Sequence, residues 1–225
     1  MFFNPQTPLL MILFFFILAL LFLLAGMNVI ALVFAEIGIP PQYILSALFF
    51  TLAGSFINIP IKKIPQERMT DEESVVFFGV RYRIPRVEEP ETVLAINLGG
   101  AVIPSLISIY LLFRTGLWIK GLLVTSIIIS VTHHLARPLK GVGIAMPAFI
   151  PPFVAALVSV VFSRHDAPVL AYIGGTLGTL IGADILNLDK ISDLGAPVAS
   201  IGGAGTFDGI FLSGVMAVLL AAFLT

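Results

Sequence analysis

The stretch Ala167-Pro-Val-Leu-Ala-Tyr-Ile-Gly-Gly-Thr-Leu-Gly-Thr-Leu-Ile-Gly-Ala-Asp-Ile-Leu-Asn187 carries a single charge, on Asp184. An apolar run of about 20 residues is long enough to cross the hydrocarbon core of a bilayer as an α-helix. Gly174, Gly178 and Gly182 recur at intervals of four, which predicts a seam of small residues packed closely against a neighbouring helix. Asp184 falls on a different face from this seam. The stretch therefore predicts a transmembrane helix with one carboxyl group near its end.

Six other apolar segments accompany it, at about 8–35, 42–60, 93–113, 117–135, 145–163 and 208–224. The chain has 225 residues, of which 58% are hydrophobic and 11% are charged. Soluble domains carry about 25% charged residues, so this composition excludes a soluble globular enzyme and a disordered chain. We predict an all-α integral membrane protein, a single polytopic domain over 1–225 with about seven transmembrane helices. The count is six if 145–163 is re-entrant, and Pro147, Pro151 and Pro152 are expected to kink or break that span.

Net charge and cysteine content exclude some classes of partner and of chemical site. The net charge is −1, which argues against a nucleic-acid partner. The chain has no cysteine, so disulfides, thiol nucleophiles and zinc–thiolate sites are excluded. The N-terminal segment lacks the basic start of a signal peptide and is expected to remain as a span. The lipid bilayer is the expected partner, and the oligomeric state is left open.

The basic residues are distributed unevenly between the two sides of the predicted topology. Nine of the 12 Lys and Arg residues fall on one side, and Arg114, Lys120 and Arg164 fall on the other. Because the more basic side is normally cytoplasmic, we predict a multi-pass protein of the cell (plasma) membrane with its N-terminus in the cytoplasm.

The one sizeable loop, 61–92, is expected to form a soluble hairpin insertion between the second and third spans. In it, Val80, Tyr82 and Ile84 alternate with Arg81 and Arg83, which is the period of a half-buried strand. We expect residues 57–64 to pair with this strand as a small cytoplasmic β-hairpin. The hairpin is either a spacer or a docking surface for a partner or anionic lipid.

Polar residues gather at the predicted cytoplasmic ends of the spans, whereas the opposite ends look nearly bare apart from Glu36. The residues singled out are Asp184, Asp208, His133, His134, Arg137, Lys140, Asn187, Gly203 and Gly205. Placing an ionisable side chain in a membrane segment costs free energy, so each such residue is a candidate for a functional role. Adjacent histidines point about 100° apart on a helix, and no metal-binding spacing accompanies them. We therefore expect no metal and no cofactor, although a site of His133 or His134 with Asp184 and Asp208 would offer ligand types that suit zinc, iron or manganese.

Asp184 and Asp208 are expected on neighbouring antiparallel helices, where two carboxyl groups can share one proton. One then activates a water as a base while the other protonates the leaving atom. Simpler roles stay open for both residues. Asp208 follows a glycine run and precedes an apolar run, as an N-cap residue does. Asp184 can be a polar helix end facing headgroups, although the helix dipole disfavours a carboxylate there.

Two resemblances follow from these motifs. Gly203-Ala-Gly205-Thr-Phe-Asp208 is similar to the Gly-x-Gly-Asp motif of the presenilin and signal-peptide-peptidase group of intramembrane aspartyl proteases. It departs from that motif because Thr206 and Phe207 intervene. The family's later Pro-Ala-Leu motif also has no place here. The whole chain, through His133-His134 and the run from Ser200 to Leu212, resembles an uncharacterised family of prokaryotic membrane proteins. That second resemblance implies membership but no activity.

The sequence leaves three functions open. The first is an intramembrane aspartyl hydrolase or peptidase with Asp184 and Asp208 as catalytic residues. Its substrate would be a transmembrane peptide or a small molecule, bound by His133, His134, Arg137, Lys140, Asn187, Gly203 and Gly205. The second is a proton- or cation-coupled transporter, which the interrupted spans favour. The third is a non-catalytic membrane or lipid-binding protein.

Overall fold

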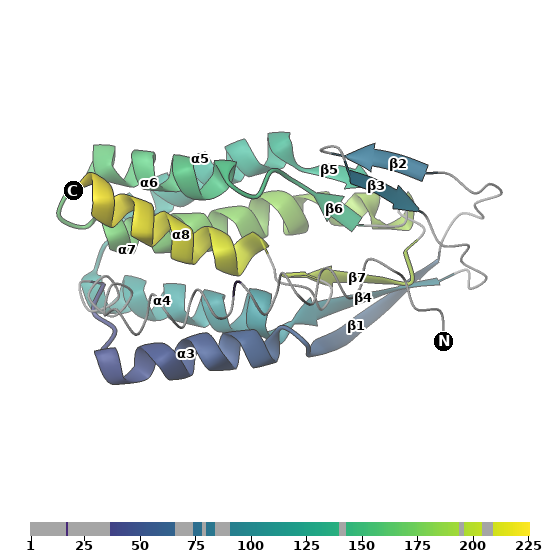
Figure 1. Cartoon of the computed structure of the whole chain (residues 1–225), viewed down its shortest axis with the longest axis horizontal. Coiled ribbons are helices and arrows are strands. Elements are labelled where there is room, and N and C mark those ends of the chain that lie inside the picture. The colour runs from purple at the N-terminus through teal and green to yellow at the C-terminus, as the bar shows by residue number, and fades with distance from the viewer. Residues whose placement is uncertain are drawn as a thin grey trace.

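The helices lie side by side along the long axis of the molecule, and strands extend from one end of them (Figure 1). The structure, a computed structural model, describes Ile17 and residues 37–65, 74–77, 80–83, 91–139, 143–193, 196–203 and 209–225. We call the end that carries strands β1 (Asn58–Pro65), β4 (Glu91–Asn97) and β7 (Val198–Ile201) the strand end. The end that carries the links at 116–117 and 163–166 is the opposite end.

Six α-helices are described: α3 (Pro41–Gly54), α4 (Ile103–Thr115), α5 (Trp118–Leu135), α6 (Ile150–Phe162), α7 (Ala167–Thr179) and α8 (Gly209–Leu224). A π-helical turn, η1 (Leu98–Val102), precedes α4. Another, η2 (Leu180–Asp184), and a 3-10 segment, η3 (Ile185–Asp193), continue α7. The described chain is thus mostly helical, as predicted.

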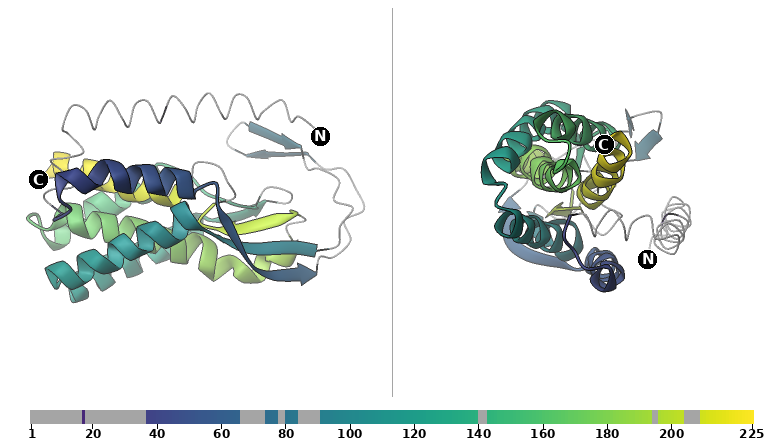
Figure 2. Two further views of the ribbon diagram at one scale, coloured as in Figure 1. Left: turned by 90° about the horizontal axis from the view of Figure 1, so that it is seen from below. Right: turned by 90° about the vertical axis from the view of Figure 1, so that its left-hand side faces the viewer.

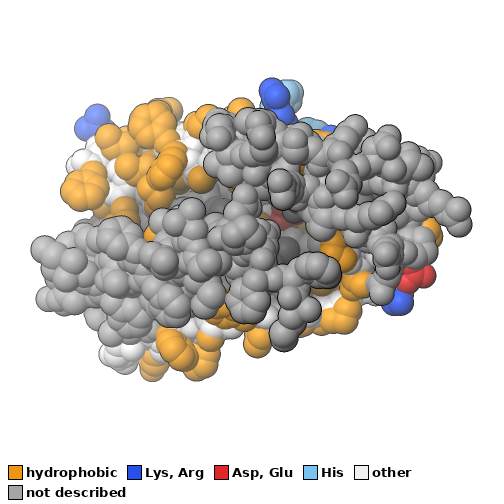
Figure 3. All heavy atoms as spheres, turned by 45° about the vertical axis from the view of Figure 1, so that its right-hand side comes forward, with side chains coloured by type: hydrophobic (Ala, Val, Ile, Leu, Met, Phe, Trp, Pro, Cys, Tyr) orange, Lys and Arg blue, Asp and Glu red, His pale blue; other side chains and the backbone are white. Residues whose placement is uncertain are grey.

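Three described helices are long and apolar enough to cross a membrane: Leu98–Thr115, Trp118–Leu135 and Ala167–Ile191. Shorter apolar helices occupy Ile150–Phe162 and Ser213–Leu224. The predicted count of seven spans is therefore not confirmed, and the first predicted span, 8–35, lies outside the described residues except for Ile17. Large apolar side chains such as Phe113, Ile119 and Val161 are 72%, 78% and 84% exposed. Orange hydrophobic side chains also make up most of the described surface in Figure 3. This surface suits a lipid environment.

Helix α7 is the inner helix of the bundle. It contacts α4, α5, α6 and α8, and the end-on view shows it between α5, α6 and α8 (Figure 2). The predicted glycine seam is confirmed, because Cβ atoms at Gly174, Gly178 and Gly182 would collide with α5. A Cβ at Gly178, for example, would lie 2.5 Å from Ile128. The glycines therefore set the close approach of α7 to α5.

The strands form one three-stranded sheet and two strand pairs. In the sheet, β1 pairs antiparallel with β4, and β4 pairs parallel with β7. The pairs are β2 (Ser74–Phe77) with β3 (Val80–Arg83), and β5 (Arg137–Leu139) with β6 (Gly143–Ala145). A small hairpin inside 61–92 is thus present, but the predicted pairing of 57–64 with 80–84 was wrong. Alternation identifies a strand without identifying its partner, and the true partner of β1 is an apolar segment that runs directly into a helix.

The segment 145–163 is interrupted, as expected, but only at its start: β6 ends at Ala145, Pro147 lies in the connection, and α6 begins at Ile150. Pro151 and Pro152 lie in the first turn of α6. There a missing backbone N–H costs nothing and the fixed φ suits the helix. The prolines therefore begin α6, and the discontinuous helix of the bundle is the one that follows it.

Candidate functional site

The hydrogen-bond pattern of the inner helix changes twice before the strand end. Helix α7 passes into the π-turn η2 and then into the 3-10 segment η3, with non-helical angles at Asn187 (φ −116°, ψ 15°). The Asn187 side chain is fully buried. Its Nδ2 donates to the carbonyls of Ala183 at 2.9 Å and Gly182 at 3.2 Å. Asn187 therefore satisfies the carbonyls that the change of helix type releases, and it holds the break in place.

The orientation of the Asn187 amide is set by its neighbours. Lys190 Nζ donates to Asn187 Oδ1 at 2.6 Å, and an ammonium group can only donate. The opposite edge of the amide therefore faces the two carbonyls with its N–H groups. The same Nδ2 lies 3.4 Å from His133 Nδ1, so this ring nitrogen is the acceptor in that contact. His133 of α5 is thereby tied to the break in the inner helix.

Asp184 ends the π-turn and reaches the loop that follows the sheet. Its Oδ2 accepts a hydrogen bond of 2.7 Å from the backbone N–H of Gly202. Gly202 follows β7 directly and has φ +85°. A Cβ there would lie 2.6 Å from backbone and side-chain atoms of Ala101, so only glycine fits. Among the described residues, no Lys, Arg or His forms an ion pair with Asp184.

A polar network fixes the sheet beside this contact. Asn58 Oδ1 accepts from Asn97 Nδ2 at 2.9 Å and from Ser200 Oγ at 2.6 Å, which links all three strands. Asn97 Nδ2 also donates to the Ser55 carbonyl, and Asn97 Oδ1 accepts from Gly100 N. These side chains have structural partners, and they place the turn after β7 relative to the helices.

Helices α7 and α8 pack antiparallel along the path that leads to Asp184. A Cβ on Gly175 would touch Ser213 and Ala217 of α8. Further along, Thr179 Oγ1 lies 3.2 Å from Ser213 Oγ. Leu180 and Ile210 share one buried cluster. Asp184 lies about one turn beyond Leu180, toward the start of α8.

The structure brings some of the predicted site residues together and not others. Asp184, Asn187 and His133 lie at the strand end, and Gly203 follows Gly202 in the turn after β7. His134 is exposed, and its Nδ1 bonds to the Ser130 carbonyl of its own helix. Arg137 is exposed on β5. Asp208, Lys140 and Gly205 lie outside the described residues. Within the described part of the chain, no cluster of three or more His, Asp or Glu side chains could hold a metal ion.

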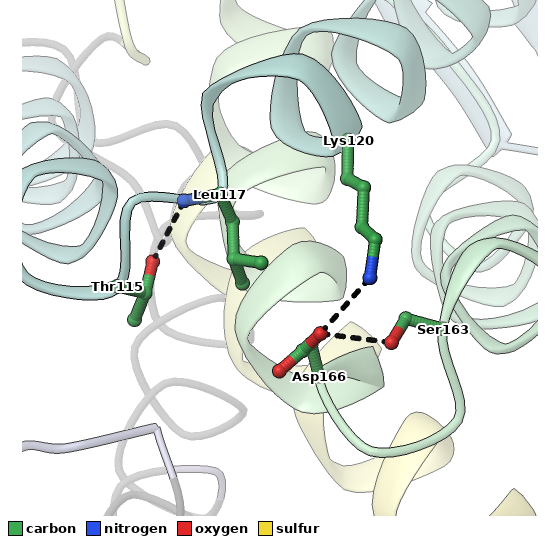
Figure 4. Close-up of polar contacts among 5 residues, drawn as sticks. All are labelled: Thr115, Leu117, Lys120, Ser163 and Asp166. Atoms are coloured by element: carbon green, nitrogen blue, oxygen red, sulfur yellow. Dashed lines mark hydrogen bonds and ion pairs between the residues drawn. The ribbon is translucent and has the colours of Figure 1, made fainter.

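Sequence reasoning missed a polar cluster at the opposite end, which was expected to be nearly bare. Asp166 Oδ2 accepts from Ser163 Oγ at 2.8 Å and from Lys120 Nζ at 3.2 Å, so one carboxylate joins α5, α6 and α7 (Figure 4). Partial burial raises the pKa of Asp166, but the Ser163 and Lys120 hydrogen bonds and the nearby positive charges outweigh burial and lower it below 3.8. The sequence signal for this cluster was the spacing Ser163-x-x-Asp166 directly before Ala167-Pro168, which is typical of the start of a helix.

A family model covers most of this architecture. The model, described as a protein of unknown function (DUF1614), matches residues 52–220. The chain belongs to the DUF1614 family. The match runs from α3 into α8 and includes the break after α7 and the Gly202 turn, which confirms the predicted membership of an uncharacterised family. No curated protein and no solved structure matches the DUF1614 chain. The local resemblance to presenilin-like proteases thus gains no support.

Proposed function

We propose that this DUF1614 protein is an intramembrane aspartyl hydrolase that uses Asp184 and Asp208 as a carboxyl pair. The observation that carries the proposal is the antiparallel register of α7 and α8. Thr179 meets Ser213, and Leu180 meets Ile210. We propose that this register continues for one more turn beyond the described residues, so that Asp208 comes to lie opposite Asp184. The position of Asp208 there is part of the proposal, because that residue lies outside the described part of the chain.

The contact between Asp184 and Gly202 supports a chemical role. The backbone N–H holds Oδ2, which fixes the side-chain rotamer and leaves Oδ1 to share a proton with a second carboxyl group. In hydrolysis of an amide, the ionised carboxylate takes a proton from water as the oxygen bonds to the carbonyl carbon. The protonated carboxyl group gives its proton to the leaving nitrogen as the C–N bond breaks.

The other predicted site residues take supporting roles in this proposal. His133 and Asn187 hold the break in the inner helix that positions Asp184, so they act as positioning residues. The exposed His134 and Arg137, with Lys140, would meet the substrate or lipid headgroups at the strand end. Gly203 and Gly205 would allow a substrate to approach the loop that leads to Asp208.

We also propose the number of spans and the orientation of the chain in the membrane. We infer seven spans, formed by 8–35 and the six helices α3 to α8, in the cell membrane with a cytoplasmic N-terminus. The strand end then faces the cytoplasm. The unequal distribution of Lys and Arg supports this orientation. The sheet would lie outside the hydrocarbon core, because open sheet edges are not tolerated there.

The test is cleavage of a single-span reporter peptide by the full chain in proteoliposomes. We expect Asp184→Asn and Asp208→Asn each to reduce cleavage by about 100-fold or more, the scale of losing a general acid or base. Asp189→Asn is the matched control, because Asp189 is an exposed carboxylate at the same end. Folding of each variant is checked by thermal unfolding. Cleavage that survives either Asn variant would exclude the carboxyl pair.

A further inference from the structure

Lys190 is a partly buried basic residue beside the break in the inner helix. Its Nζ donates to Asn187 Oδ1 at 2.6 Å, and this is its only hydrogen bond within the described part of the chain. The Asn187 amide is neutral, and no described carboxylate forms an ion pair with Lys190. This includes the adjacent Asp189, which is exposed. A partly buried ammonium group with only a neutral partner favours an anion as its next ligand.

The imidazole of His133 contacts the other atom of the same amide. Asn187 Nδ2 lies 3.4 Å from His133 Nδ1, which is the acceptor in this contact. In the neutral ring the proton is therefore on Nε2, and Nε2–H is a donor with no partner among the described residues. Lys190 of η3 and His133 of α5 thus present donor groups on either side of one buried amide.

A third donor group follows directly after α5. Ala136 has extended backbone angles and ends that helix, so Arg137 begins β5. Strand β5 contacts η3, the segment that carries Lys190. The Arg137 side chain is exposed and forms no hydrogen bond or ion pair in the described part of the chain. Donor groups from α5, β5 and η3 therefore gather beside the break, and basic clusters of this kind between membrane helices bind the headgroups of anionic lipids.

Large apolar side chains are exposed just before these donors in the chain. Ile185 and Leu186 precede Asn187 directly and are 41% and 47% exposed, although α7, the helix that they continue, is almost wholly buried. The inner helix therefore reaches the surface of the bundle at its break. Acyl chains can pack on Ile185 and Leu186 while a phosphate group meets the donors. A free phosphate ion would leave this apolar surface unused.

We infer that the strand end holds a binding site for an anionic phospholipid, whose phosphate accepts hydrogen bonds from Lys190, His133 and Arg137. The ammonium group has three donors, so Lys190 can bind the phosphate and keep its contact with Asn187. The headgroup supplies the negative charge that Lys190 and Arg137 lack among the described residues. The bound lipid joins η3 to the end of α5. The site does not rest on the proposed hydrolysis.

Titration of the full chain with short-chain phospholipids in a neutral detergent tests the site. Thermal unfolding is followed as phosphatidylglycerol is added, because a ligand of the native state raises the melting temperature. We expect a saturable rise with phosphatidylglycerol and no comparable rise with phosphatidylcholine of the same chain length. Inorganic phosphate at the same concentration distinguishes a lipid from a free anion. An equal rise with inorganic phosphate, or no rise with phosphatidylglycerol, would overturn the inference.

Single substitutions locate the bound lipid. We expect Lys190→Gln and Arg137→Gln each to weaken the apparent affinity for phosphatidylglycerol about fivefold, the effect of about 1 kcal/mol for one basic residue near an anionic headgroup. Arg164→Gln is the matched control, because Arg164 is an exposed arginine at the opposite end and its loss should leave the affinity unchanged. Arg137 has no partner among the described residues, so its variant folds even if Lys190→Gln disturbs the Asn187 amide. Unchanged affinity in Arg137→Gln, or an equal loss in Arg164→Gln, would overturn the site.

Discussion

At the scale of single residues, the polar groups at the strand end have distinct tasks. Asn187 satisfies carbonyls released by the break in the inner helix, and Lys190 fixes the direction of its amide. Asp184 reaches outward to the Gly202 N–H. The sequence indicated that Asp184, Asn187 and His133 lie at one end, because spans of similar length bring their ends together. It did not indicate Lys190 or Gly202 as partners, since these contacts depend on the kink at Asn187 and on the turn after β7.

Asp166 supports a prediction about stability and pH. Its pKa is lowered in the folded protein, so its contribution to stability is present above the unfolded value of 3.8 and disappears as the pH falls through the folded value. We expect Asp166→Asn to lower the melting temperature at pH 7, with the difference from the parent chain closing as the pH falls below 3.8. The effect is modest because partly exposed ion pairs contribute at most about 1 kcal/mol. Asp189→Asn is the control, and a difference independent of pH would contradict the explanation.

At the scale of elements, helices were easier to predict than strands. The segment 117–135 matches α5 (Trp118–Leu135) almost residue for residue, because Gly116 ends one helix and begins the next connection. The segment 93–113 was taken as a single span, although its first residues belong to β4. An apolar run alone does not separate a buried strand from the start of a helix. The parallel strand β7 was missed for a different reason. Its partner, β4, lies about 100 residues away in the chain, so no local pattern indicates the pairing.

The turn between β7 and the loop before α8 gives a prediction at this scale. Gly202 and Gly116 both have positive φ, at +85° and +68°. An added Cβ meets Ala101 at Gly202 but has open space at Gly116. Alanine at either position should cost roughly 1 kcal/mol for its backbone angle, and overpacking at Gly202 should add about 1–3 kcal/mol. Thermal unfolding in detergent should therefore show a clearly larger decrease for Gly202→Ala than for Gly116→Ala. Equal decreases would mean that the turn does not pack tightly on η1.

At the scale of the whole molecule, composition was enough to predict a helical membrane protein, and the described helices that are long and apolar enough to cross a membrane agree with that class. The number of spans was harder to predict, because several apolar segments divide between helix and strand. The bundle surrounds one discontinuous helix, which has acids at its two ends and hydroxyls between them. The strand end combines this helix with a sheet and a glycine turn. The central claim is that α8 brings a second carboxyl group to this same end.

Cross-linking of introduced thiols tests that claim most directly. The chain has no cysteine, so the double variant Asp184→Cys/Asp208→Cys can be treated with a short bifunctional thiol reagent without background. The antiparallel register predicts rapid intramolecular cross-linking of this pair in the membrane. The pair Asp166→Cys/Asp208→Cys, with its thiols near opposite ends of the inner helix, should not react. Failure of the 184–208 pair to cross-link in a folded variant whose thiols both react singly would contradict the carboxyl pair.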